Sequence, residues 1–103
     1  MVARGEIWWG EAPDDKGRPF LVVSRDAANQ VMGRVLVAPV TSRVRRVPSE
    51  LTLGHDEGLP RASVASFDNL RPFPKAMLVR RLGALAPGRR HELCTVAAAT
   101  LDC

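Results

Sequence analysis

Short apolar runs alternate with polar turns along the whole chain, and their spacing is typical of strands. The best strand pattern lies at residues 35–40, where β-branched and apolar residues follow one another. Two earlier runs flank the polar residues 12–17 and so predict a hairpin. The full set of expected strands is residues 7–10, 18–24, 35–40, 51–53, 62–65, 67–70 and 79–85.

Helical patterns occur in two places. Residues 26–31 have a helical composition but are few, and Gly33 ends them. Near the C-terminus Pro87 suits the first position of a helix. Five later residues recur at helical spacing on one face, namely Leu93, Val96, Ala97, Thr100 and Leu101. We expect this second helix to pack on the sheet as a lid.

Proline interrupts the strand pattern at three positions. Pro39 cannot donate to a sheet ladder, so its strand must reach an edge or a bulge there, and a bulge would re-aim Thr41. Pro72 and Pro74 are expected to end a sheet segment, followed by a single turn at residues 75–78.

These elements predict a mainly β (α+β) fold. We expect a small, strongly bent antiparallel sheet that forms a partial barrel, with short helices and a C-terminal α-helix. At 103 residues the chain suits one domain, residues 1–103, with one core.

Trp8 and Trp9 must point to opposite faces of their strand, so one belongs in the core while the other meets a partner or a base. A dimer interface is the use we favour for it.

Charge adds a preference for anionic partners. The chain has 15 Lys and Arg against 11 Asp and Glu, a net charge of +4, and arginine supplies most of the positive charge. Arginine binds phosphate through paired hydrogen bonds, which suits an anionic polymer better than a membrane surface. A solvated basic surface explains the same excess of positive charge.

No apolar run approaches the roughly 20 residues that cross a bilayer, and no secretory signal is evident, so we expect a cytoplasmic protein.

Three segments place polar side chains at strand ends. They are residues 17–24 (GRPFLVVS), 37–42 (VAPVTS) and 66–71 (SFDNLR). If the strands lie side by side, an arginine, a threonine and an Asp/Asn/Arg cluster converge, which suits phosphate chemistry. The candidates are Arg18, Thr41, Ser42, Asp68, Asn69 and Arg71.

Each candidate also has an ordinary structural explanation. Arg18 is near Asp14 and Asp15 and could be a loop arginine with surface ion pairs. Hydroxyl groups such as that of Thr41 often cap turns, and Asp and Asn side chains stabilise turns. Arg43, Arg45 and Arg46 form a basic loop that would hold phosphates or simply be solvated.

Other chemistries are poorly supported. His55, Asp56 and Glu57 are adjacent in a loop and cannot all face one metal without an unusual backbone. Ser24 lacks the surrounding glycines of a nucleophile elbow, so it does not form a triad with His91 and Asp102. We therefore expect no metal and no cofactor.

Together with residues 4–8 (RGEIW), the three segments resemble the MazF/PemK toxin family of toxin–antitoxin systems. The resemblance extends over almost the whole chain, and four motifs occur in the family's order. It implies a metal-independent endoribonuclease that cuts single-stranded RNA at short sequences and works as a homodimer. It also implies a cognate antitoxin whose acidic, disordered tail lies in the RNA groove.

The resemblance also implies roles for individual residues. Arg18 and Thr41 match the family's catalytic arginine and threonine, and Asp68 aligns with a residue proposed as general base in one branch. Asn69 and Arg71 match substrate-binding positions. The hydroxyl of Ser42 and the basic loop would add contacts to flanking phosphates.

The chain departs from the family in two places. The loop at residues 11–17 is shorter than in the best-known members and lacks their histidine, so that histidine's acid/base role does not transfer. Ser66 stands where one branch has a catalytic arginine, which leaves Arg18 as the main electrophile.

Three alternative functions stay open at this stage. A gyrase poison of the CcdB type has a similar barrel, and fold alone does not separate it from a ribonuclease. A barrel of this kind could also bind RNA without cutting it. The third alternative is a degenerate toxin that has lost activity and persists as a sink for antitoxin.

Overall fold

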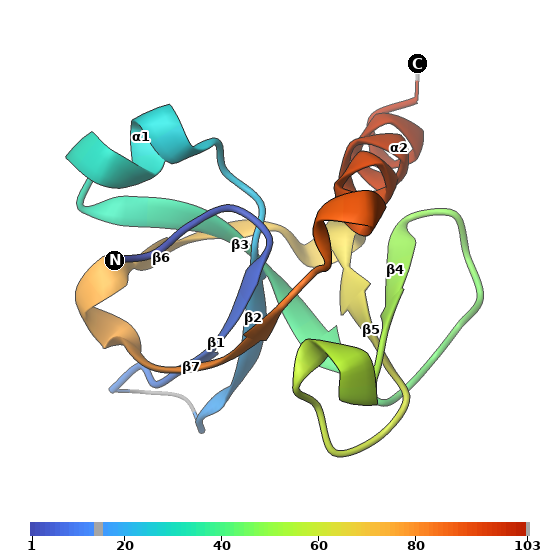
Figure 1. The fold of residues 1–103 in the computed structure, drawn as a ribbon, viewed down its shortest axis with the longest axis horizontal. Helices are drawn as coiled ribbons and strands as arrows, with labels where there is room; N and C mark the ends of the chain where they lie inside the picture. Colours follow the sequence, from blue (N-terminus) through green and yellow to red (C-terminus); the bar gives the residue numbers. More distant parts are fainter. Residues whose placement is uncertain (14–15, 103) are drawn as a thin grey trace.

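The computed structural model describes residues 1–13 and 16–102, and strands dominate it (Figure 1). The strands are β1 (Glu6–Gly10), β2 (Arg18–Val22), β3 (Arg34–Thr41), β4 (Glu50–Leu53), β5 (Ser63–Ser66), β6 (Arg71–Pro74) and β7 (Leu78–Ala84). The helices are α1 (Asp26–Val31) and α2 (Arg90–Thr100). Single 3-10 turns lie at η1 (His55–Glu57), η2 (Phe67–Asn69), η3 (Lys75–Met77) and η4 (Pro87–Arg89).

The strands form one bent antiparallel sheet in the order β4-β5-β3-β2-β1-β7, with β6 paired to β3. Within the described residues β4 and β7 end this path without pairing to each other, so the sheet is not closed. This confirms the predicted partial barrel. The hairpin predicted around residues 12–17 is present as the antiparallel pair β1 and β2, with Ile7 opposite Leu21.

Strand β3 holds the sheet together because it pairs with three other strands. One edge pairs with β2, while the other pairs first with β6, through Val37, and then with β5, from Val40 onward. Pro39 lies where β3 passes from one partner to the next, which is a place that tolerates a missing N–H donor. The expected interruption at Pro39 is therefore a change of partner strand just before Thr41.

Two expectations about the region after β5 are wrong. Residues 67–70 do not form a strand, because Phe67–Asn69 is a 3-10 turn that carries the chain from β5 to β6. Pro72 and Pro74 do not end the sheet but lie inside β6, opposite Leu36 and Arg34. Within the described residues β6 pairs with β3 alone, and prolines at alternate positions leave every second N–H for that pairing.

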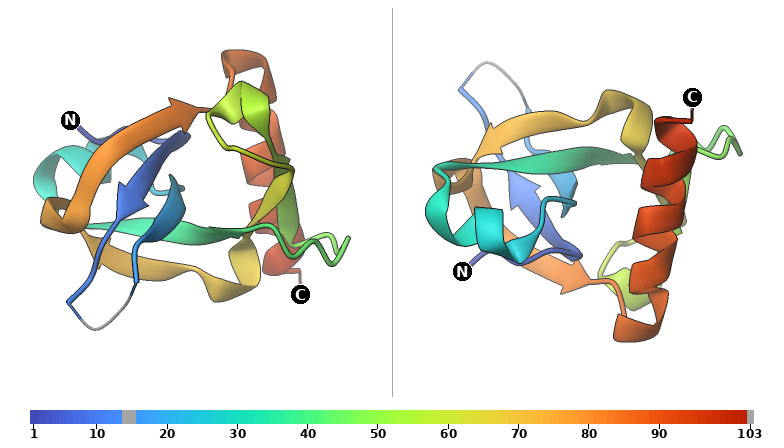
Figure 2. Two further views of the ribbon diagram at one scale, coloured as in Figure 1. Left: turned by 90° about the horizontal axis from the view of Figure 1, so that it is seen from below. Right: turned by 90° about the horizontal axis from the view of Figure 1, so that it is seen from above.

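Two clusters of buried side chains stabilise the fold. The larger includes Ile7, Leu21 and Phe67, and it continues to Leu93 and Val96 of α2. The smaller surrounds Phe20 and Phe73, and Trp8 packs against it. Figures 1 and 2 show α2 beside β4 and β5, on the side away from α1.

The C-terminal helix confirms most of the predicted apolar face. Leu93 and Val96 are buried and Ala97 packs against them, but Leu101 is 72% exposed and does not belong to that face. Pro87 opens the turn η4 that precedes α2. Leu101 lies after the last helical residue, where the backbone no longer directs side chains onto the sheet.

A close backbone crossing fixes the loop after β4. Gly58 has a φ of 89°, and a Cβ added there would overlap the carbonyl oxygen of Leu82 in β7. Glu57 is buried beside this crossing and accepts a hydrogen bond from Arg89 at 3.1 Å. The turn η1 is thus packed tightly against β7.

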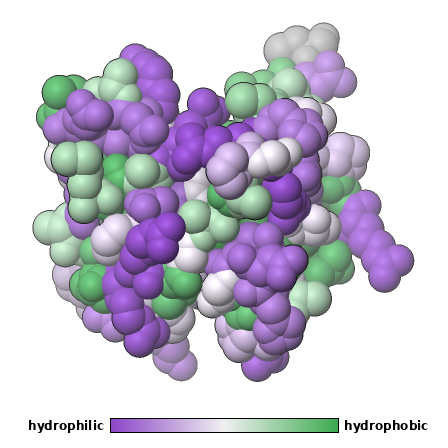
Figure 3. Space-filling view, viewed as in Figure 1, coloured by the Kyte–Doolittle hydropathy of each residue, from purple (hydrophilic) through white to green (hydrophobic). Residues whose placement is uncertain are grey.

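In the space-filling view hydrophilic side chains border a furrow between the two halves of this face (Figure 3).

Candidate active site

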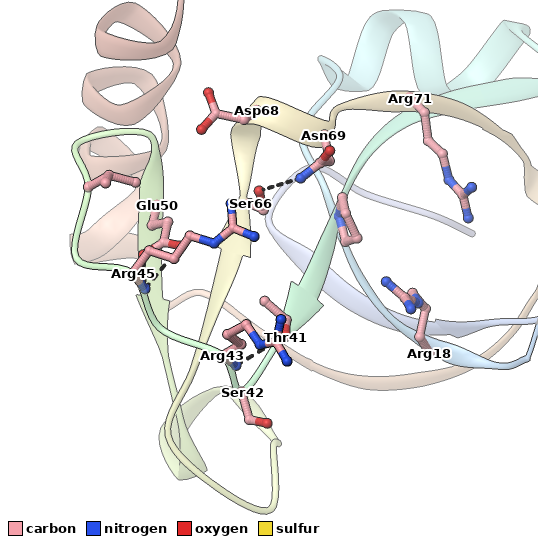
Figure 4. Close-up of a pocket in the computed structure, with 12 residues that line it drawn as sticks. Arg18, Thr41, Ser42, Arg43, Arg45, Glu50, Ser66, Asp68, Asn69 and Arg71 are labelled. Carbon is pink, nitrogen blue, oxygen red and sulfur yellow. Dashed lines mark hydrogen bonds between the residues drawn. The ribbon is translucent and has the colours of Figure 1, made fainter.

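A hollow of about 870 Å³ opens where β2, β3 and β6 come together with the loop after β3 (Figure 4). Its walls are predominantly polar, and four arginines line it. The lining residues are Arg18, Pro39, Thr41, Ser42, Arg43, Arg45, Val47, Glu50, Ser66, Asp68, Asn69 and Arg71. The three segments singled out in the sequence therefore converge, as predicted from their positions at strand ends.

Arg18 is the first residue of β2, opposite Gly10 of β1. Its side chain is exposed to the hollow, and the following Pro19 restricts the backbone at the strand start. In Figure 4 the guanidinium groups of Arg18 and Arg71 point toward the same space. The ion pairs expected between Arg18 and residues 14–15 lie outside the described residues.

Thr41 ends β3 and presents its hydroxyl group to the hollow. The oxygen Oγ1 accepts the N–H of Arg43 at 3.1 Å. Because the hydroxyl oxygen is the acceptor in this bond, its proton can be donated to a bound group. Thr41 therefore caps the turn, as the sequence suggested. This hydrogen bond orients the hydroxyl group and is compatible with a chemical role for Thr41.

Arg71, at the start of β6, is held over two aromatic rings. Its guanidinium carbon lies 5.1 Å from the ring centre of Phe20 and 5.4 Å from that of Phe73. The two rings pack on each other at a centroid distance of 4.7 Å. Cation–π contact of this kind restricts the guanidinium, and Arg71 lines the hollow.

The basic loop has a definite shape because Glu50 holds its backbone. Oε1 of Glu50 accepts the N–H of Arg45 at 3.0 Å and that of Arg46 at 2.9 Å. Arg46 has a left-handed φ of 58°, which directs these two successive N–H groups to one carboxylate. Arg43 and Arg45 line the hollow, whereas Arg46 is not among its lining residues. Sequence reasoning missed Glu50, since nothing local distinguishes it from a surface acid.

The turn η2 forms the opposite wall. Asp68 Oδ2 accepts the hydroxyl of Ser49 at 2.6 Å, and Asn69 Nδ2 donates to Ser66 Oγ at 2.9 Å. In Figure 4 the carboxylate of Asp68 points away from Arg18 and Thr41. Asp68 therefore lines the hollow at its far edge, while Asn69 lies nearer to the arginines.

Among residues 1–13 and 16–102, no three His, Cys, Asp or Glu side chains gather in a way that could hold an ion. The same part of the chain contains no helix with the length and apolar character that a bilayer crossing requires.

Comparison with known protein families gives a match over nearly the whole chain. The matching family model is described as PemK-like, MazF-like toxin of type II toxin-antitoxin system, and it covers residues 3–101. The chain is 43% identical over 105 residues to Probable endoribonuclease MazF5 of Mycobacterium tuberculosis (strain ATCC 25618 / H37Rv), with 100% of this chain and 95% of the relative covered. It is 37% identical over 103 residues to Probable endoribonuclease MazF2 of Mycobacterium tuberculosis (strain CDC 1551 / Oshkosh), with 99% and 100% covered.

Solved structures give the same result for the fold. The structure titled Mycobacterium tuberculosis toxin MazF-mt6 superposes with a TM-score of 0.86 at 30% identity, covering 94% of this chain and 96% of that one. A second, titled Endoribonuclease in complex with its cognate antitoxin from Mycobacterial species, also has a TM-score of 0.86, at 25% identity, with 98% and 95% covered.

Proposed function

Because the chain belongs to the PemK-like, MazF-like toxin family of type II toxin–antitoxin systems, we propose that it is a toxin that cleaves single-stranded RNA in the hollow around Arg18 and Thr41. Relatives that cover its full length are named endoribonucleases, and this supports cleavage over the gyrase-poison and non-catalytic alternatives. The observation that carries the proposal is the meeting of Arg18, Thr41 and Arg71 in one arginine-lined hollow.

The reaction that suits these groups is an internal transfer at phosphorus. The ribose 2′-oxygen bonds to the adjacent phosphorus while the bond to the 5′-oxygen breaks. The proton of the 2′-hydroxyl passes to a base, and the leaving oxygen takes up a proton. The products are a 2′,3′-cyclic phosphate and a 5′-hydroxyl, so neither a water nucleophile nor a metal is required.

Arg18 and Thr41 would stabilise the charge that develops on the non-bridging oxygens. Thr41 is suited to this role because the N–H of Arg43 orients its hydroxyl oxygen, which leaves the proton to donate. Loss of one such preorganised donor lowers a rate by about 10²- to 10³-fold. Both groups lie on strand ends, where the backbone keeps them in place before substrate binds.

We propose Asp68 as the general base, a role that requires its side chain to turn from the far edge of the hollow toward Arg18 and Thr41 when RNA binds. Its Oδ2 accepts the hydroxyl of Ser49, and a carboxylate has further lone pairs for a 2′-hydroxyl. The Asp68→Asn variant keeps an acceptor for Ser49 but removes the base, so its kcat should fall by about 10²- to 10⁴-fold. A kcat within threefold of wild type would assign Asp68 to holding η2 and leave the proton to another group.

The remaining candidates would hold the substrate. Arginines of the loop after β3, together with Arg71, suit flanking phosphates, and Asn69 offers an amide to a base edge. Unstacking is needed to align the 2′-oxygen, the phosphorus and the leaving oxygen, which explains a preference for single strands. The proposed RNA-binding set is Ser42, Arg43, Arg45, Arg46, Asn69 and Arg71.

Incubation of the purified protein with 5′-labelled single-stranded RNA tests the proposal. Arg18→Ala and Thr41→Ala should unfold in urea like wild type yet lose cleavage, whereas Arg34→Ala, an exposed arginine that does not line the hollow, should cut normally. Excess EDTA should leave cleavage unchanged. Undiminished cutting by either site variant would refute the assignment, and loss of cutting in EDTA would require a metal.

The family also suggests partners and a setting. We propose a homodimer of one toxin domain, residues 1–103, acting in the cytoplasm with a cognate antitoxin that has an acidic, disordered tail. A solved relative is described as an endoribonuclease in complex with its cognate antitoxin, and an arginine-lined hollow suits an acidic segment. Expression alone should arrest growth, and co-expression with the antitoxin should restore it.

A further inference from the structure

A second hollow, of about 540 Å³, adjoins the first on the other side of Arg18 and Thr41. Arg18, Thr41 and Ser42 line both hollows, so these residues form a shared border between them. The two differ in chemistry. The first is lined by arginines and by two carboxylates, whereas the second combines an aromatic ring, prolines and leucines with two further arginines.

Trp9 supplies the aromatic ring of this second hollow. It lies in β1, opposite Pro19 on one side and Arg80 on the other. Its indole Nε1 donates to Oε2 of Glu11 at 3.0 Å. Gly17 packs against the ring so closely that a Cβ there would overlap it. The ring is therefore restrained before any ligand arrives.

The facing wall of the second hollow is also preformed. Leu59, Pro60 and Arg61 follow η1, the turn fixed against β7 by the backbone crossing at Gly58. Arg61 and Arg80 are both exposed at this hollow. The described lining residues include no Asp or Glu, so the charge offered to a ligand here is positive.

A restrained aromatic ring beside exposed arginines has the properties that unstacked nucleotides require. Every base has a flat face that can stack on an aromatic ring, and arginine binds the attached phosphate. The border residues Arg18 and Thr41 are those proposed to act on the cleaved phosphate. A nucleotide in the second hollow would therefore adjoin that phosphate directly.

We propose that the second hollow binds the nucleotide next to the cleaved bond, with its base stacked on Trp9 and its outer phosphate on Arg61 and Arg80. This subsite rests on the proposed ribonuclease function and adds a substrate contact that the three sequence motifs do not contain. It assigns Trp9 to a base and not to the dimer interface favoured from the sequence. Because any base can stack on an aromatic ring, the subsite increases affinity for RNA without selecting a base, and it holds the bound nucleotide unstacked from its neighbour. The RNA contacts proposed for the first hollow are unchanged.

The two tryptophans of the chain allow a direct test. Trp8→Phe leaves Trp9 as the only indole, and Trp9→Phe leaves Trp8, which packs against the smaller core cluster and donates to Glu6. The probe is a single-stranded 2′-O-methyl RNA of a sequence that wild type cuts, since it lacks the 2′-hydroxyl nucleophile. Binding should quench the fluorescence of Trp8→Phe and leave that of Trp9→Phe unchanged.

Affinity for the same RNA supplies a second readout. Trp9→Ala should bind about 5- to 150-fold more weakly, whereas Trp9→Phe, which keeps an aromatic face, should stay within about threefold of wild type. Replacing Arg61 and Arg80 together with Gln removes the contact to that one phosphate and should reduce the dependence of log Kd on log salt by about 0.7. Arg34→Gln is the matched charge control and should not change this slope.

The outcomes separate the subsite from the proposed function. Suppose that wild type cuts RNA and Arg18→Ala does not, but that RNA leaves the fluorescence of Trp8→Phe unchanged. The subsite is then refuted, and the proposed ribonuclease function is supported. If an acidic peptide quenches Trp9 and RNA does not, the hollow belongs to a protein partner and the subsite is again refuted. If wild type neither cuts nor binds single-stranded RNA, both proposals fail.

Discussion

Removal of Glu50 is predicted to weaken RNA binding, although it removes a negative charge from an anion-binding hollow. The carboxylate holds the N–H groups of Arg45 and Arg46, and Arg46 is in the left-handed conformation. In Glu50→Ala the loop after β3 loses this anchor. When RNA binds to the arginines, part of the binding free energy is then used to order the loop, so the affinity falls.

The size of the effect depends on two opposing contributions. Hydrogen bonds to a charged group stabilise by about 1.5–3 kcal/mol when buried, and since Glu50 is only half-buried we assign about 1–2 kcal/mol to its hold on the loop. Repulsion between its charge and a phosphate roughly 8 Å away is about 0.5 kcal/mol in water, and salt screens it further. The difference, about 0.5–1.5 kcal/mol, corresponds to about 2- to 12-fold weaker binding in Glu50→Ala.

Fluorescence anisotropy with labelled 2′-O-methyl RNA at moderate salt measures this difference. Glu50→Gln is the matched control, because its amide oxygen can still accept one N–H while the charge is gone, and it should bind within about twofold of wild type. Urea unfolding of both variants checks that the sheet is intact. Tighter binding by Glu50→Ala than by wild type would show that charge, and not loop order, determines affinity here.

Three further predictions concern stability and the electrostatic character of binding. Gly58→Ala should lower the free energy of unfolding by about 2 kcal/mol or more, because the residue has a positive φ and faces a backbone carbonyl of β7, whereas Gly88→Ala, with open space around it, should be nearly neutral in urea melts. Burial tends to raise the pKa of Glu6, but hydrogen bonds from Trp8, Arg81 and an N–H outweigh it, and the pKa lies below its ordinary value of 4.5. The stability that this carboxylate adds is present above the unfolded pKa and lost as pH falls through the lower folded pKa, so urea midpoints should decline less steeply on acidification in Glu6→Gln than in wild type. RNA affinity should fall steeply as salt rises, and a flat salt dependence would contradict phosphate binding by the arginine-lined hollow.

The elements that depend on neighbouring residues could be predicted well from the sequence. The β1–β2 hairpin, the short helix at residues 26–31 and the strand around residues 35–40 all follow from local spacing of apolar, β-branched and turn residues. The errors lie where long-range contacts decide. Pro72 and Pro74 are compatible with β6 only because that strand pairs on one side, and a single sequence does not reveal which strands have a free edge.

The candidate site divides in the same way. By itself the sequence determined which chemical groups are available, since Arg18, Thr41 and Arg71 stand at the ends of recognisable segments in an order that resembles a known family. Their convergence was predicted from strand ends, but the tertiary structure decided how each side chain is held and which further groups it contacts. It placed Arg71 over the ring of Phe20 and brought Asn69 into one hollow with Arg18, across contacts between residues far apart in the chain. Local backbone preferences act over a few residues, whereas such meetings depend on how β3 divides its edge between β6 and β5.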